Sequence, residues 1–379
     1  MMKAQLNIFS PVAELDQPHE SKFIALSINK TLPISTHYSF IDSIRMVSMM
    51  GIVWAHISLF SFKKLDYNAF DNISIYLPFM QIWKFGVINF FMISGFLLKE
   101  KLDLNHPFLY FKHRIKNILK PYLIAFILCG ILTILQLWKH QLLYNSNPSS
   151  VLEKLVFQTP FWYIPNYLIC LFIIIITSKF INSFYYGLVL LAITLYYSIL
   201  SVYLKNSYIP HSEVLLGYVF FLWLGYTFNS KNLLNFFLKI KWPILIILIL
   251  ATFALSSYES YILYINSYKS YFSILRISNV LYSIVAFIIL AKLFSQTNLG
   301  DKFAGLQKNT YGIYLYHYFF VSFIIPQIGF FIERKFQFQI FTYHIKYFIL
   351  SYLIVFVISY ILTNYFIKAL KFIHFGFLK

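Results

Sequence analysis

Residues 40–62 read FIDSIRMVSMMGIVWAHISLFSF, an apolar run that is interrupted by Arg45 and His56. A helix needs about 20 apolar residues to cross a hydrocarbon core ~30 Å thick, so this run is long enough to span a membrane once. Apolar blocks of similar length recur along the 379-residue chain. They predict an all-α polytopic membrane protein with about ten transmembrane helices, since each helix satisfies its own backbone hydrogen bonds.

The amino-acid composition excludes an ordinary soluble domain. The chain is 59% hydrophobic and 12% charged, with a mean hydropathy of +0.68, whereas a soluble domain has about 25% charged residues. The apolar blocks lack the alternating ~10-residue pattern of an outer-membrane barrel. The net charge of +18 comes from Lys and Arg residues scattered through short connections, which indicates membrane topology and no nucleic-acid partner.

The predicted spans have the approximate bounds 40–62, 80–98, 118–138, 161–178, 183–204, 213–229, 242–257, 274–294, 309–331 and 345–367. With the N-terminus inside, 20 of the 31 Lys and Arg residues fall on the inner side. Cytoplasmic connections carry such an excess, so both termini are expected in the cytoplasm. The expected organisation is a cytoplasmic segment at 1–39, one transmembrane domain at 40–368 and a cytoplasmic tail at 369–379.

Arg45 and His56 are ionisable residues at membrane depth, which by default suggests a function. On a helix, eleven residues separate the two side chains by only about 20° around the axis and by about 16 Å along it. One face would therefore carry a cation near the cytoplasm and an imidazole deeper in. This geometry suits an extended anionic ligand such as acyl-coenzyme A. The alternative is that Arg45 extends to the lipid headgroups and His56 hydrogen-bonds a neighbouring helix.

Two further segments allow both a structural and a functional interpretation. The stretch from Asn89 to Leu98 contains Ser94 and Gly95, small residues that let helices approach closely. A basic segment with Arg114, Lys116 and Lys120 precedes the third predicted span. The positive-inside rule explains these cations, and the alternative is that they capture phosphate groups.

Aromatic and histidine side chains mark the fourth and ninth predicted spans. Trp162 and Tyr163 are typical of an aromatic belt at the membrane interface, with sugar binding as the alternative. Tyr314 and His317 share one helix face at a spacing of three residues, where they could line a polar cavity or make an interhelical hydrogen bond. Cys129 and Cys170 lie inside apolar blocks and the acidic residues are isolated, so no disulfide framework or metal site is expected.

Five short stretches occur in an order that resembles a known family of membrane enzymes. They are Arg45-x10-His56, FFMISGFLL at 90–98, Arg114 before Pro121-Tyr122, Trp162-Tyr163, and YLYH at 314–317. Together they are similar to the acyltransferase-3 family of integral membrane acyltransferases.

The resemblance implies a ten-helix domain in the inner (plasma) membrane. Such a domain takes an acyl group, most often acetyl, from cytoplasmic acyl-CoA to a hydroxyl of an envelope polysaccharide or glycolipid outside. The sequence leaves the acceptor, the acyl length and the oligomeric state open.

The resemblance also suggests a role for each candidate residue. His56 would act as a general base or as a transient acyl carrier, with His317 completing the catalytic pair. The expected donor-binding residues are Arg45, Ser94, Arg114, Lys116 and Lys120. The expected substrate-binding residues are Asn89, Trp162, Tyr163 and Tyr314.

Two other functions remain as alternatives at the level of sequence. A transporter or flippase for an anionic or glycan substrate would use Arg45 and His56 as a binding and proton-relay pair. A membrane acyltransferase of another architecture would act on a lipid or a protein.

Overall fold

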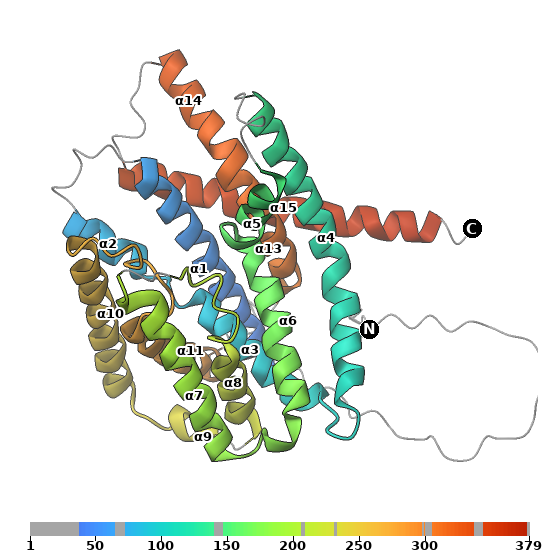
Figure 1. Ribbon diagram of the computed structural model, residues 1–379, viewed down its shortest axis with the longest axis vertical. Helices are drawn as coiled ribbons and strands as arrows, with labels where there is room; N and C mark the ends of the chain where they lie inside the picture. The colour runs from blue at the N-terminus through green and yellow to red at the C-terminus, as the bar shows by residue number, and fades with distance from the viewer. Residues whose placement is uncertain are drawn as a thin grey trace, which may run out of the picture. The chain divides into compact units, whose positions relative to one another are not determined.

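The computed structural model describes residues 38–64, 73–139, 147–205, 209–230, 233–297, 299, 305–336 and 344–376. Every regular element among these residues is a helix, which confirms the predicted all-α class (Figure 1). The α-helices are α1 (Ser39–Lys64), α2 (Ile73–Gln81), α3 (Gly86–Lys101), α4 (Pro107–Lys139), α5 (Pro148–Phe157), α6 (Tyr163–Ile176), α7 (Phe184–Ser198), α8 (Val219–Ser230), α9 (Leu233–Leu238), α10 (Trp242–Ile265), α11 (Ile277–Gln296), α13 (Thr310–Phe319), α14 (Ile325–Phe336) and α15 (His344–Gly376). The short 3-10 or π segments are η3 (Pro160–Trp162), η4 (Ser178–Phe180), η5 (Ile199–Tyr203), η6 (Gly305–Asn309) and η7 (Phe320–Ile324).

Seven helical segments of the described residues are long and apolar enough to cross a membrane. The count is eight if α5 and α6, which meet at a 76° bend, form one span. The predicted number of ten is therefore not confirmed. The sixth predicted span corresponds to the short helix α8, and the ninth is divided into α13, a π segment and α14.

The basic segment before the third predicted span is helical, not a loop. Helix α4 runs without a break from Pro107 to Lys139 and includes Pro121 within it. Pro107 stands at the first helical position, where proline is well tolerated. The Lys and Arg residues that follow are good helix formers. A search for apolar stretches stops at these charges, so it misplaces the start of the helix.

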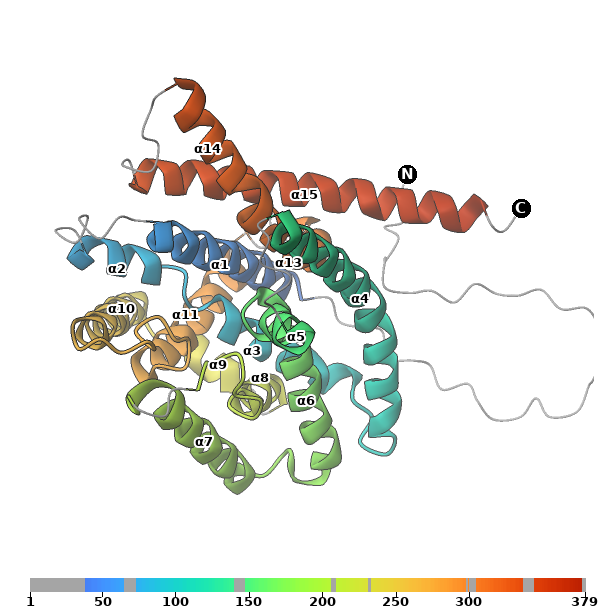
Figure 2. The ribbon, with the colours of Figure 1, turned by 45° about the horizontal axis from the view of Figure 1, so that its top comes forward.

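Helix α1 is the central element around which the candidate site is built. It packs against α3, α11, α13 and α15 (Figure 2). Its Trp54 lies at ring-centroid distances of 4.4 Å from Phe348 on α15 and 4.8 Å from Phe79 on α2. These contacts hold the middle of α1 in an apolar cluster that also includes Ile313 of α13.

Helices α3 and α8 approach each other closely at two glycines. Gly95 faces the backbone of Leu222 on α8, and Gly225 faces the backbone of Met92 on α3. A Cβ atom on either glycine would lie 1.9 Å from the opposing carbonyl oxygen. Small residues permit this kind of approach between membrane helices, so Gly95 has the packing role that was one of its two interpretations.

Candidate active site

The basic end of the site, defined here by Arg45, Lys101 and Arg114, gathers side chains from α1, α3 and α4. Arg45 makes an ion pair with Asp42, one helical turn earlier, at 3.1 Å. Arg114 donates a hydrogen bond from Nε to the Tyr110 hydroxyl at 3.2 Å. Arg45, Lys101 and Arg114 lie close enough to interact electrostatically with one another. The cluster therefore concentrates positive charge where the sequence predicts a phosphate site.

The two predicted donor-binding lysines do not join this cluster. Lys116 and Lys120 are exposed on α4. On a helix they lie about 160° and 120° away from Arg114 around the axis. Lys101, in contrast, was not selected from the sequence. Lys101 ends α3 directly after an apolar run. Lysines commonly follow predicted spans in this way, so the sequence did not distinguish Lys101 from the others.

The two predicted catalytic histidines are in contact. The rings of His56 on α1 and His317 on α13 have a centroid distance of 5.2 Å and an interplanar angle of 41°. His317 is completely buried, whereas the ring of His56 is half-buried. The sequence could not establish this contact, because it depends on how α13 packs against α1.

The hydrogen bond of His317 fixes its tautomer. Its Nδ1 lies 3.0 Å from the backbone carbonyl oxygen of Ile313. A carbonyl oxygen can only accept, so Nδ1 carries the proton and Nε2 carries the lone pair. Nε2 is buried and has no hydrogen-bond partner among the described residues. An accepting nitrogen is thus available beside His56.

Aromatic side chains surround the histidine pair. The Tyr314 hydroxyl donates a 2.6 Å hydrogen bond to the carbonyl of Pro160, at the bend between α5 and α6. Its ring lies 6.3 Å from that of His317 and 5.7 Å from that of Tyr163. Trp162 is only 6% exposed. Trp162 is therefore part of the interior, not of an interfacial belt.

The predicted substrate-binding residue Asn89 is buried on α3, and both atoms of its amide lack a hydrogen-bond partner within the described part of the chain. Leaving a buried polar group unpaired costs about 1–3 kcal/mol, so the position is suited to a ligand or a water molecule. Ser94, one and a half turns further along α3, interacts with the Tyr163 hydroxyl. These residues lie on the helix that ends at the basic cluster.

Two further residues that interact with His56 are absent from the candidates chosen from the sequence. Lys84, in the turn before α3, and His211, in the connection before α8, both interact electrostatically with His56. The ring of His211 lies 5.5 Å from that of Trp162. Burial lowers the pKa of His211 to about 3, with a further contribution from Lys84, so His211 is neutral at physiological pH. Lys84 falls inside the second predicted span, 80–98, where its charge did not mark it as a candidate.

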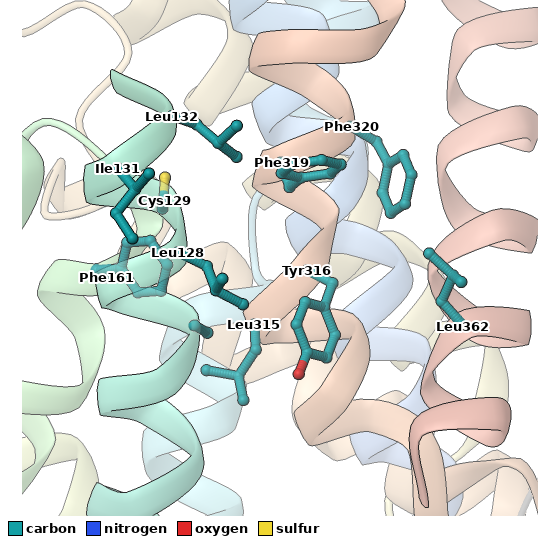
Figure 3. A pocket seen from close by; sticks show the side chains of 11 residues that line it. Leu128, Cys129, Ile131, Leu132, Phe161, Leu315, Tyr316, Phe319, Phe320 and Leu362 are labelled. Atoms are coloured by element: carbon teal, nitrogen blue, oxygen red, sulfur yellow. The ribbon is translucent and has the colours of Figure 1, made fainter. Parts of the chain in front are cut away.

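A separate apolar cavity of about 350 Å³ lies between α4, α13 with η7, and α15 (Figure 3). Leu128 and Leu132 of α4 face Leu315 and Phe319 across it, and Leu362 of α15 borders it (Figure 3). Its lining suits hydrocarbon, and the ionisable side chains in it are those of Cys129 and Tyr316. Among the described residues no group of three His, Cys, Asp or Glu side chains could hold a metal ion.

Comparison with known proteins gives one match. A family model described as an acyltransferase domain matches residues 38–373. No curated protein and no solved structure matches the chain.

Proposed function

The chain belongs to this acyltransferase family and is a membrane acyltransferase. From that premise we propose that it moves an acyl group, acetyl in the simplest case, from cytoplasmic acyl-CoA to a hydroxyl of an envelope polysaccharide or glycolipid outside. The observation that carries the proposal is the contact between the rings of His56 and His317, whose centroids lie 5.2 Å apart. His56 is on the same helix as Arg45. His56 is then reached from the basic end by an arm about 16 Å long.

Donor binding uses the basic end. Arg45 and Arg114 offer planar guanidinium groups that suit the phosphates of coenzyme A, and Lys101 adds charge. Asn89 supplies an unpaired amide that can exchange hydrogen bonds with an amide of the pantetheine arm. The thioester then lies near His56.

The transfer step follows from a neutral imidazole at His56. As a general base, His56 takes the proton of the acceptor hydroxyl while the hydroxyl oxygen attacks the thioester carbonyl. The C–S bond breaks, and the histidinium returns the proton to the leaving CoA thiolate. The lone pair on Nε2 of His317 can accept a hydrogen bond from the His56 ring, which orients that ring and stabilises its charged form.

The same residues allow a two-step route in which the His56 ring carries the acyl group transiently. A single measurement separates the two routes. With labelled acetyl-CoA and no acceptor, the carrier route gives a stoichiometric burst of CoA and a label on the protein. The general-base route gives neither.

Acetyl-CoA binding to the purified protein in nanodiscs tests the donor half. Arg45→Ala and Arg114→Ala should each weaken binding, whereas Lys179→Ala, an exposed lysine of η4, should leave it unchanged. Lys116→Ala and Lys120→Ala test the sequence-based assignment of these lysines. Absence of acetyl-CoA binding in the parent protein, or equal binding in the arginine variants, would refute the donor site. Glycan movement without CoA release would instead favour a transporter.

A further inference from the structure

Two lysines are buried among the described residues, and their surroundings differ. Lys292, near the end of α11, is 5% exposed and donates a hydrogen bond to the carbonyl of Ile240, with the Trp242 ring 5.3 Å from its ammonium. Lys84 is 4% exposed, and its ammonium lies 2.9 Å from the centroid of the Phe272 ring. No side-chain hydrogen bond or ion pair of Lys84 occurs within the described residues.

The neighbours of Lys84 add positive charge and no negative charge that would balance its ammonium. It interacts electrostatically with Arg276, a fully buried guanidinium. Arg276 is satisfied by neutral acceptors: Gln81 Oε1 at 2.6 Å, and the carbonyls of Ser256 and Ser273. Burial lowers the pKa of Arg276 only to about 10, so it stays charged at neutral pH.

The carboxylate that interacts with Arg276 is already engaged. Glu259 interacts electrostatically with Arg276, but its oxygens accept hydrogen bonds from the Tyr203 hydroxyl and from Ser278. The other ionisable groups that interact with Lys84 are the imidazoles of His56 and His211. A buried lysine with a second cation beside it, and with no carboxylate hydrogen-bonded to it within the described residues, keeps its charge only where an anion pairs with it.

We propose that Lys84 forms an anion-binding subsite for the acceptor, which holds a carboxylate or phosphate group of the carbohydrate beside His56. The inference rests on the proposed function, since it takes His56 as the point of transfer. Lys84 precedes α3 and Lys101 ends it. A helix of that length holds its two ends about 23 Å apart, so the subsite is separate from the basic end that would hold the donor phosphates. An anionic acceptor would complete the charge balance of Lys84 and direct a neighbouring hydroxyl towards His56. A neutral acceptor would leave the ammonium unpaired.

The test measures anion binding by thermal stabilisation of the full chain in detergent, because a ligand that binds only the folded state raises the unfolding midpoint. The probes are glucuronate, inorganic phosphate and neutral glucose, each titrated at constant ionic strength. Glucuronate or phosphate should raise the midpoint of the parent protein in a saturable manner, and glucose should not. The probe that reaches half-saturation at the lower concentration identifies the bound group as a carboxylate or a phosphate.

Lys84→Met and Lys292→Met form a matched pair of variants. Lys84→Met should raise the anion concentration at half-saturation by about tenfold or more, as expected when a charge-assisted hydrogen bond is lost. Lys292→Met should keep the response of the parent protein. Without ligand, Lys84→Met should be as stable as the parent or more stable, since it removes an unpaired buried charge. If Lys84 served only to pack against Phe272, this variant would be less stable.

Acetyl-CoA binding is measured on the same preparations, so that the two proposals fail separately. Loss of acetyl-CoA binding in the parent protein would refute the proposed function. Normal acetyl-CoA binding with no anion response in the parent, or with an equal response in Lys84→Met, would refute the subsite.

Discussion

Replacement of Gly95 by alanine should destabilise the contact between α3 and α8. The new Cβ atom would lie 1.9 Å from the carbonyl oxygen of Leu222, where real Cβ atoms essentially never come closer than 3.0 Å. Because the obstacle is backbone, the two helices must separate by about 1 Å. Overpacking costs about 1–3 kcal/mol, and a gap of this size also loses a quarter to a half of the local dispersion energy. We therefore expect a loss of about 3 kcal/mol.

The measurement is the free energy of unfolding in one detergent, with acetyl-CoA affinity as the functional readout. The matched control is Gly130→Ala on α4, whose Cβ would meet only the end of the Leu155 side chain, at 3.3 Å. Gly225→Ala should cost as much as Gly95→Ala, and the double variant should cost less than the sum, since one separation relieves both clashes. A Gly95→Ala variant as stable as the Gly130→Ala control would refute this packing.

Three further outcomes follow from single side chains. Asn89→Leu should weaken acetyl-CoA binding without lowering the unfolding midpoint, because it removes an unpaired buried amide; a fall in stability with unchanged binding would make the residue structural. Tyr314→Phe should lose about 1 kcal/mol of stability with its hydrogen bond to Pro160, and an unchanged unfolding midpoint would contradict that bond. The pKa of His211 is about 3 in the folded protein and about 6.5 when the chain is unfolded. Below pH ~6.5 the unfolded state therefore binds a proton that the folded state does not, and the contribution of His211 to stability is lost as the pH falls towards 3. His211→Gln should therefore flatten the acid side of the stability profile, and a profile parallel to that of the parent would show that the ring is not buried as a neutral group.

The sequence predicted the helical class and identified both histidines as candidates, because apolar length and isolated ionisable residues are local signals. It could predict that Arg45 and His56 share one face of α1, since helix geometry fixes their spacing. The contact of His56 with His317 depends on the packing of α1 against α13. That packing joins residues more than 250 positions apart, and no local pattern encodes it.

The residues that the sequence did not identify are those whose surroundings depend on tertiary packing. Lys84 and Arg276 lie at the ends of predicted spans and were not candidates from the sequence, yet both are almost completely buried. Burial of a cation depends on partners such as Phe272 and Gln81, which come from other elements of the fold. Trp162 shows the same limit, since a tryptophan at a span end suits either a lipid interface or an interior wall, and only packing distinguishes them.

The release of CoA thiol from acetyl-CoA, measured on purified protein reconstituted with an envelope glycan extract, tests the central claim most directly. The parent protein should release CoA together with acylated glycan. His56→Gln should bind acetyl-CoA normally but release no CoA above background, because it keeps hydrogen-bonding atoms and loses the basic nitrogen. A His56→Gln variant that folds and retains the parent's rate of CoA release and glycan acylation would contradict the account.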